Sequence, residues 1–219
     1  MGGSVKIFLD TADVEAIRAR IDSGVVDGVT TNPSIIMKSG KPFEPVAREI
    51  LELVPGDVSI EAMSTTCDEM VAESRQLANW GKNAVIKLPM TRDGIKALSI
   101  LSQENIRINL TMVASLNQAL LACKAGAHYV SIIVGRIDAT GADGMEVVRD
   151  TRTMMREYGF DAQIIIGSVR TPHHVMMSIR AGAQVLTLGT AVFDQLYDHP
   201  LTEAGLEQFA KDWQAVENR

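Results

Sequence analysis

Lys87 is the residue whose type and surroundings point most directly to chemistry. It lies within the apolar run 85–89, which is typical of a buried strand. Burying an ammonium group is costly unless the group has a partner or a use. Apolar surroundings favour the neutral amine, which can attack a carbonyl carbon and form a Schiff base. We therefore interpret Lys87 as a Schiff-base nucleophile; the alternative is a structural ion pair with Asp10 or Glu61.

Those two carboxylates lie at or near the ends of other predicted strands. Asp10 and Glu61 could carry the proton transfers that imine formation and carbon–carbon cleavage require. Asp10 has an alternative role, because it could be the N-cap of a helix that begins near Asp13.

Two arginines follow later predicted strands and suit an anion. The guanidinium forks of Arg136 and Arg170 match a phosphate dianion, and Ser168 adds a hydroxyl between the same loops. The alternative is a surface arginine paired with Asp138 or Asp143, and this applies to Arg136 more than to Arg170.

Short β-branched runs alternate with segments of helical period along the whole chain, which indicates repeated βα units. The predicted strands cover 5–10, 28–31, 58–63, 84–88, 107–111, 129–134, 163–168 and 185–189. The predicted helices cover 13–22, 43–53, 68–80, 93–103, 116–125, 144–158 and 172–181, followed after the last strand by a short helix and a final one over 202–217. Asp13 and Ser115 are the predicted N-caps, and glycines stand at the predicted C-caps: Gly81, Gly126, Gly159 and Gly182. Eight such units favour an α/β fold, a single (β/α)8 TIM barrel with an extra C-terminal helix. An open doubly wound sheet stays possible, although no GxGxxG follows the first strand.

In such a barrel the C-terminal strand ends form the active face. Polar residues occur at or near these ends on seven of the eight predicted strands: Asp10, Asn32, Glu61, Lys87, Asn109, Thr111, Ser131 and Ser168. Residues two apart share a face of a strand, so Asn109 and Thr111 should point the same way, as should Ser131 and Ile133. Any one serine or threonine could instead cap a helix or bind loop backbone.

Composition limits the other possibilities. The 219 residues carry a formal net charge of −6 with no run of basic residues, which argues against a nucleic-acid surface. No apolar stretch is long enough for a membrane helix, and we expect a cytoplasmic protein. Cys67 and Cys123 suggest neither a disulfide framework nor a metal site. We treat 1–219 as one domain, with residues 1–4 as a disordered leader or cloning remnant.

The residues quoted so far resemble the transaldolase family, in particular its short-chain branch that includes fructose-6-phosphate aldolases. The resemblance covers nearly the whole chain. It is carried by Phe8-Leu9-Asp10-Thr11-Ala12, Gly28-Val29-Thr30-Thr31-Asn32-Pro33-Ser34, Val85-Ile86-Lys87-Leu88-Pro89, Ala125-Gly126-Ala127 before Tyr129-Val130-Ser131, and Gly135-Arg136-Ile137-Asp138.

The resemblance implies a role for each site residue. Lys87 would form the imine with C2 of a ketose phosphate, and Asp10 would be the acid/base at the C3–C4 bond. Glu61 and Thr111 would hold a catalytic water. The remaining predicted contacts bind substrate: Thr30, Asn32, Asn109, Ser131 and Ile133 around the dihydroxyacetone portion, and Arg136, Ser168 and Arg170 at the distal phosphate. No metal or organic cofactor is implied.

Particular residues bear on the substrate. Glu61 and Asn109 resemble transaldolases more than the aldolase branch, which favours transfer of a three-carbon unit over release of dihydroxyacetone. Ile133 departs from the family, which usually has Phe or Tyr at this position. It leaves open a modified sugar, such as one bearing a sulfonate instead of a phosphate.

The C-terminal segment resembles the part of the short branch that packs on a neighbouring subunit, so we expect a homo-oligomer, a pentamer or decamer. The alternative is that this helix packs on its own barrel. Two rival functions remain: a phosphosugar-binding or isomerase barrel in which Lys87 is only an electrostatic group, and a ring-forming scaffold with an inactive site. The four histidines have no spacing that suggests zinc.

Overall fold

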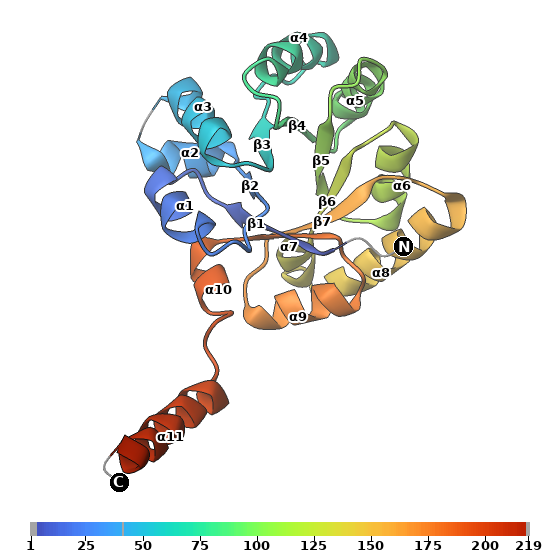
Figure 1. Ribbon diagram of the computed structural model, residues 1–219. Helices are drawn as coiled ribbons and strands as arrows, with labels where there is room; N and C mark the ends of the chain where they lie inside the picture. Colours follow the sequence, from blue (N-terminus) through green and yellow to red (C-terminus); the bar gives the residue numbers. More distant parts are fainter. Residues whose placement is uncertain (1–3, 41, 218–219) are drawn as a thin grey trace.

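Eight parallel strands pair in chain order and close on themselves, so that β8 also pairs with β1 (Figure 1). The computed structural model describes residues 4–40 and 42–217. The strands are β1 Lys6–Asp10, β2 Gly28–Thr30, β3 Asp57–Glu61, β4 Ala84–Pro89, β5 Ile108–Val113, β6 Tyr129–Ile133, β7 Gln163–Gly167 and β8 Val185–Leu188. The helices are α1 Val14–Ile21, α2 Pro33–Ser39, α3 Phe43–Leu53, α4 Cys67–Ala78, α5 Arg92–Gln103, α6 Leu116–Lys124, α7 Val134–Asp138, α8 Gly144–Tyr158, α9 Pro172–Arg180, α10 Thr190–Asp194 and α11 Pro200–Glu217.

The closed barrel confirms the predicted (β/α)8 fold and rules out the open doubly wound sheet. Each predicted strand is present, and its ends differ from the prediction by at most two residues. Residues 1–3 of the predicted leader lie outside the described residues.

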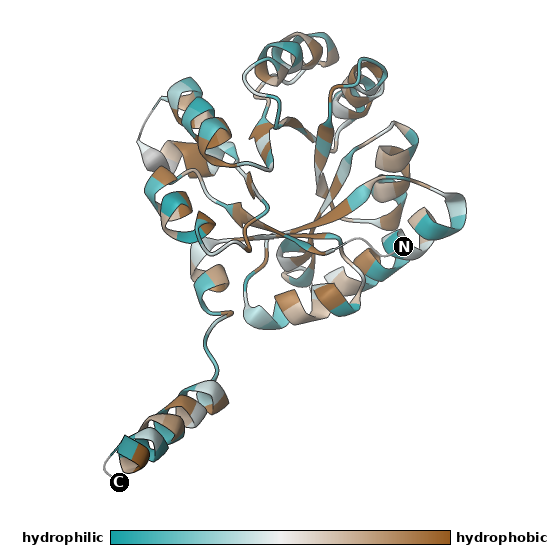
Figure 2. Ribbon diagram, viewed as in Figure 1, coloured by the Kyte–Doolittle hydropathy of each residue, from teal (hydrophilic) through white to brown (hydrophobic). Residues whose placement is uncertain are grey.

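Apolar residues predominate along the strands (Figure 2), and their alternation between the two faces builds two apolar layers. Side chains such as Leu9, Ile60 and Ile86 face outward and pack in the core shared with the helices. A second set, contributed by five strands, packs inside the barrel: Phe8, Val85, Tyr129, Ile165 and Val185. Because neighbours in a strand point to opposite faces, the same parity that fills the barrel interior carries polar residues to its ends.

Local signals fix several helix ends. The predicted N-caps Asp13 and Ser115 both accept backbone N–H bonds, from Ala16 and Gln118. Gly159 ends α8 in the left-handed conformation, with φ of 66°, as predicted for a C-cap.

Gly126 and Gly182 have positive φ just after the ends of α6 and α9, as expected for glycines that stop a helix. The prediction for Gly81 was wrong, because α4 already ends at Ala78 with Asn79 as its cap.

Two short helices, α2 and α7, were not predicted. They have only seven and five residues, which is too short for a repeating apolar pattern of helical period. The local signal for α2 was present in the sequence: Asn32 caps the helix and Pro33 occupies its first turn.

The C-terminal helix α11 extends away from the barrel and buries none of its residues (Figure 1). Leu206, Phe209 and Trp213 are exposed on it. This arrangement contradicts the alternative in which α11 packs on its own barrel. None of the described helices is long and apolar enough to cross a membrane.

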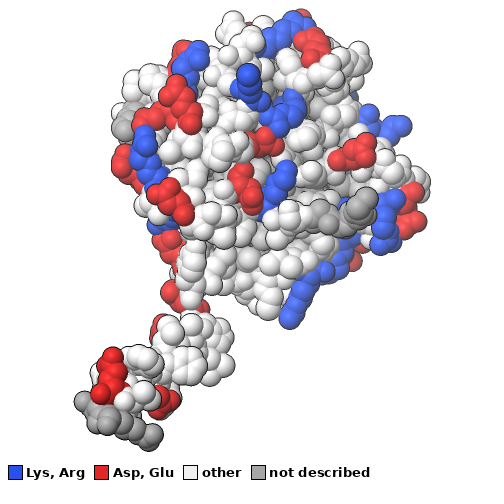
Figure 3. Space-filling model, in the orientation of Figure 1, with Lys and Arg blue, Asp and Glu red and all other residues white. Residues whose placement is uncertain are grey.

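On the face shown in Figure 3, acidic and basic side chains are interspersed, and no extended basic patch forms there.

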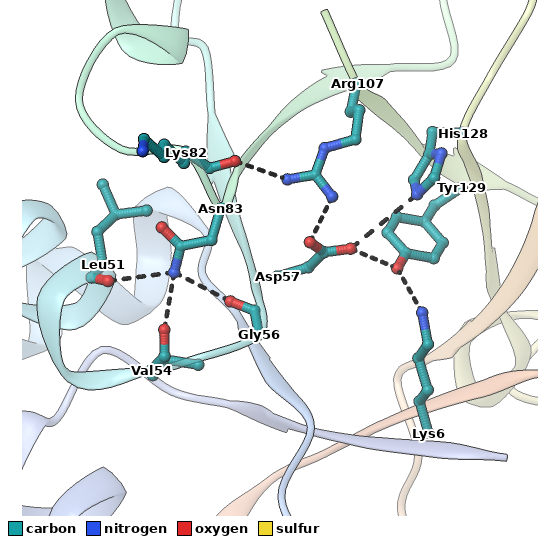
Figure 4. Close-up of polar contacts among 10 residues, drawn as sticks. All are labelled: Lys6, Leu51, Val54, Gly56, Asp57, Lys82, Asn83, Arg107, His128 and Tyr129. Atoms are coloured by element: carbon teal, nitrogen blue, oxygen red, sulfur yellow. Dashed lines mark hydrogen bonds and ion pairs between the residues drawn. The ribbon is translucent and has the colours of Figure 1, made fainter. Parts of the chain in front are cut away.

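A polar cluster closes the barrel at the N-terminal ends of the strands (Figure 4). Tyr129 is fully buried, and its hydroxyl donates to Asp57 at 2.6 Å. Arg107 binds the other oxygen of Asp57 at 2.5 Å, and the Lys6 ammonium lies 3.4 Å from the Tyr129 hydroxyl. Burial raises the pKa of Tyr129, and the bond to Asp57 raises it further. Burial also lowers the pKa of the neighbouring His128. The cluster joins β1, β3 and β6 to Arg107, the residue before β5, and so stabilises this end of the barrel.

We predict that Tyr129→Phe lowers the free energy of unfolding by about 1–2 kcal/mol, because Asp57 loses a buried donor. Chemical denaturation monitored by circular dichroism measures this. The matched control is Tyr158→Phe, at a side chain that is 76% exposed, where a change under about 0.5 kcal/mol is expected. Equal losses in both variants would contradict the role given to the cluster.

Candidate active site

A cavity of about 490 Å³ opens at the C-terminal ends of the strands. It is lined by eleven of the twelve predicted site residues: Asp10, Thr30, Asn32, Glu61, Lys87, Thr111, Ser131, Ile133, Arg136, Ser168 and Arg170. The fold thus gathers side chains from seven strand ends around one space, as the barrel prediction required.

Lys87 lies at the base of this cavity and is 8% exposed. Its ammonium is 3.1 Å from a carboxylate oxygen of Glu61 and donates to the backbone carbonyl of Thr31 at 3.1 Å. Glu61 and Lys87 are register partners on β3 and β4, which explains their approach. The ion pair gives the lysine a partner that can hold its proton, so it is compatible with both interpretations of Lys87.

Asp10 is partly buried in the cavity wall and accepts a 2.8 Å hydrogen bond from the Thr30 hydroxyl. Burial raises the pKa of Asp10, against the opposing effects of the Lys87 charge and the Thr30 bond. The alternative that Asp10 caps α1 is wrong, because Asp13 occupies that position. A carboxyl with raised pKa beside a buried lysine is suited to proton transfer.

Asn109 is the predicted residue that does not line the cavity. It is fully buried, and its amide donates to the hydroxyl of Ser59 at 3.1 Å. Its side-chain oxygen has no hydrogen-bond partner among the described residues. Asn109 therefore lies below the cavity floor, with an acceptor to spare.

Thr111 follows on the same face as Asn109, as the strand parity predicted, and it lines the cavity. The next residue, Met112, has φ of 65° at an irregularity in the pairing of β5 with β6. The bulge interrupts the strand directly after Thr111.

Asn32 performs two tasks. It lines the cavity, and its side-chain oxygen caps α2 by accepting the Ile35 N–H at 3.0 Å. The capping alternative considered for polar groups at strand ends is thus correct in part for this residue, and its amide nitrogen is the group left to face a ligand.

Arg136 and Arg170 reach the cavity from α7 and from the loop after β7. Neither guanidinium forms an ion pair within the described chain. The carboxylates considered as partners of Arg136 bind elsewhere: Asp138 accepts the Gly144 N–H and lies 3.4 Å from His174, and Asp143 pairs with Arg149. The alternative of a paired surface arginine is therefore wrong for Arg136, and two cations remain available to an anion.

The loop between β7 and α9 is held in an unusual conformation. Ser168 has φ of 59°, which is uncommon for a residue other than glycine, and it lies one residue beyond β7. The backbone N–H of Arg170 donates to Nδ1 of His174, whose other ring nitrogen faces Asp138. Backbone strain of this kind persists where surrounding contacts fix it. His174 and Asp138 supply such contacts, which the sequence spacing did not reveal.

Gly135 allows α7 and the loop after β7 to approach each other. A Cβ at this position would collide with the carbonyl oxygen of Ser168 and come within 3.0 Å of the Arg170 side chain. The absence of a side chain at Gly135 thus sets the spacing between Arg136 and Arg170.

Two polar residues on the inner face of the strands were missed from the sequence. Thr187 on β8 lines the cavity, and its hydroxyl is 2.5 Å from that of Thr30. Ser59 lies beneath, bound to Asn109. Both alternate correctly with outward-facing apolar neighbours, so strand parity is the signal that could have identified them.

The fold and the cavity define a barrel whose active face carries a buried lysine, flanking carboxylates and two arginines that form no ion pair with the described residues. Residues 7–219 match the family described as transaldolase/fructose-6-phosphate aldolase, and the chain belongs to this family.

Similar curated proteins support this family assignment. A probable transaldolase from Aquifex aeolicus is 50% identical over 97% of this chain and 98% of its own length. Another from Lactiplantibacillus plantarum is 46% identical, and one from Geobacter sulfurreducens is 49% identical, each over 97% of this chain and 98% or 99% of its own length.

We predict that Gly135→Ala raises the KM for a sugar phosphate about ten- to hundredfold, because the added methyl group forces α7 and the loop after β7 apart. The kcat should fall less, since Lys87 lies elsewhere in the cavity. Steady-state kinetics measure both constants. Gly205→Ala, where an added Cβ meets nothing within 4 Å, is the control and should keep both. An unchanged KM in the Gly135 variant would refute the spacing argument.

Proposed function

We propose that this protein is a Schiff-base (class I) transaldolase that moves a dihydroxyacetone unit from a ketose phosphate to an aldose phosphate. Fructose 6-phosphate and sedoheptulose 7-phosphate are the proposed donors. The observation that carries the proposal is the Lys87 ammonium, buried in the active-face cavity 3.1 Å from Glu61. A lysine so placed can return its proton to a neighbour and attack a carbonyl.

The proposed reaction begins when the Lys87 amine adds to C2 of the donor. Glu61 and Thr111 hold the water that leaves as the imine forms. Asp10 then takes the proton of the C4 hydroxyl while the C3–C4 bond breaks. The electron pair of that bond moves toward the imine nitrogen and gives an enamine. The aldehyde portion departs, and the three-carbon unit stays on Lys87.

Transfer reverses these steps. The enamine carbon attacks the acceptor aldehyde, and Asp10 returns its proton to the new hydroxyl. Water then adds to the imine and releases the product from Lys87. The imine is the electron sink, so this route needs no metal or organic cofactor.

The proposed substrate contacts fall into two groups. Thr30, Asn32, Ser131 and Ile133 surround the dihydroxyacetone portion near Lys87. We assign Asn109 an indirect part in this group, since it lies below the cavity and acts through its free oxygen.

The proposed contacts of the substrate's distal anion are Arg136, Arg170 and Ser168. The two guanidiniums, which form no ion pair with the described part of the chain, supply the charge, and forks of this kind suit a phosphate. A sulfonate would also be held. Ile133, which lines the same cavity, offers a sugar neither a ring to stack on nor a hydrogen bond, and it keeps a modified donor as the alternative.

Glu61 and Asn109 favour transfer over aldol cleavage that releases dihydroxyacetone. The names of the relatives, each a probable transaldolase, support the same choice. On this basis we place the enzyme in the pentose phosphate pathway of the cytoplasm.

We also propose that copies of the chain assemble through α11, as a pentamer or decamer. The helix leaves large apolar side chains in water, among them Phe209 at 70% and Trp213 at 62% exposure. Contact with another copy would cover them.

We predict that borohydride added with fructose 6-phosphate traps a three-carbon adduct on Lys87. Intact mass and peptide mapping would detect it. Lys87→Met should give no adduct and lower turnover by more than about a thousandfold, while the exposed-lysine control Lys82→Met should give the wild-type adduct. Turnover retained by Lys87→Met would instead support an isomerase-type barrel, and wild-type protein without an adduct would refute imine chemistry on this donor.

Product analysis separates the two activities of the family. With fructose 6-phosphate and erythrose 4-phosphate we expect sedoheptulose 7-phosphate as the main product. Without the acceptor, little free dihydroxyacetone should form, because the enamine stays covalently bound to Lys87 until an aldehyde binds. Rapid release of dihydroxyacetone without acceptor would mark the protein as an aldolase.

A further inference from the structure

Three polar side chains from neighbouring strands form a chain of contacts at one wall of the cavity. Asp10 ends β1, Thr30 ends β2 and Thr187 lies in β8; β1 pairs with both of the other strands. The Thr30 hydroxyl is 2.8 Å from a carboxylate oxygen of Asp10 and 2.5 Å from the Thr187 hydroxyl. Thr30 and Thr187 are 2% and 5% exposed, and both line the cavity.

Proton counting fixes the direction of these bonds. Each hydroxyl has one hydrogen to donate. When Asp10 is ionised it can only accept, so Thr30 gives its hydrogen to Asp10. The hydrogen between the two threonines must then come from Thr187, and Thr187 presents lone pairs to the cavity.

Protonation of Asp10 allows the chain to reverse. The carboxyl can donate to Thr30, Thr30 can donate to Thr187, and the Thr187 hydrogen turns toward the cavity. The threonines only rotate their hydroxyls, so none of their covalent bonds breaks. The donor or acceptor character of Thr187 at the cavity wall therefore follows the protonation state of Asp10.

We propose that Thr187 is a positioning residue for the reaction. It holds Thr30 as a hydrogen-bond donor to ionised Asp10, and its own hydroxyl changes from acceptor to donor at the cavity wall when Asp10 takes the substrate proton. The inference rests on the proposed function, in which Asp10 is the acid/base of C3–C4 cleavage. In the reversed state the Thr187 hydroxyl is a donor to the oxygen from which Asp10 has removed the proton.

Opposing effects act on the pKa of Asp10, so a small contribution from Thr187 can change it. Lys87 is the charged group that lowers the pKa of Asp10, and it is itself paired with Glu61. Burial acts in the opposite direction. A donor that receives a hydrogen bond is polarised and donates more strongly, so Thr187 strengthens the bond by which Thr30 lowers the pKa of Asp10.

Thr187→Val removes the hydroxyl and keeps the side-chain volume. We expect the acid limb of kcat/KM for fructose 6-phosphate cleavage to move to higher pH by ~0.5 unit or more, with a lower kcat. Thr187→Ser, which restores the hydroxyl, should keep the limb close to its wild-type position. Thr151→Val is the matched control, because Thr151 is fully buried with a hydroxyl that has no hydrogen-bond partner among the residues that the structure describes.

Borohydride trapping with dihydroxyacetone separates this inference from the proposed function. That ketone forms the imine without C3–C4 cleavage, so Thr187→Val should still be trapped on Lys87. A wild-type pH profile in Thr187→Val, or loss of trapping along with cleavage, would overturn the role of Thr187 while leaving the Schiff base in place. Failure of the wild-type protein to be trapped at Lys87 would overturn the proposed function, and the inference with it.

Discussion

A closed parallel barrel gives each strand side chain only two directions, toward the helices or toward the barrel axis. In this protein the constraint decides which groups can meet. Asp57, Ser59 and Glu61 lie two residues apart on β3 and face the interior at three successive levels. Register then aligns Glu61 with Lys87 and Lys87 with Asn109 on the next strands. The ion pair at the base of the cavity follows from closure and register, with no special loop.

The two carboxylates of β3 show how the ends of one barrel can differ. At the N-terminal end, Asp57 is enclosed by Arg107 and the Tyr129 hydroxyl, and its hydrogen-bonding capacity is used within the protein. At the other end, polar groups retain capacity: the Asn109 oxygen has no described partner, and the guanidiniums of Arg136 and Arg170 have none either. A satisfied polar cluster adds rigidity, and an unsatisfied one is available to a ligand. The satisfied cluster around Asp57 stabilises the barrel, and the barrel holds the polar groups of the cavity in place.

Much of this could be predicted from the sequence, because the information was local. Period-two and period-3.6 patterns identified the strands and the longer helices, and the strand ends then identified the polar residues of the cavity. What could not be predicted depended on partners distant in the chain. Whether Asp10 capped a helix, and whether Arg136 was paired, were settled only by where Asp13, Asp138 and Asp143 make their bonds. Thr187 was missed because a threonine in an apolar strand is unremarkable until β8 closes against β1.

Arg136 and Arg170, which form no ion pair with the described residues, also affect how the proposed sugar phosphate would reach the cavity. The chain as a whole has a formal charge of −6, so a phosphate far from the surface meets a net repulsive field. Close to the mouth, Arg136 and Arg170 reverse the sign of that field. At physiological salt the Debye length is about 8 Å, so the distant repulsion is largely screened while the short-range attraction survives. The ionic strength of the medium thus governs the diffusional approach of the sugar, whereas the two guanidiniums govern its capture.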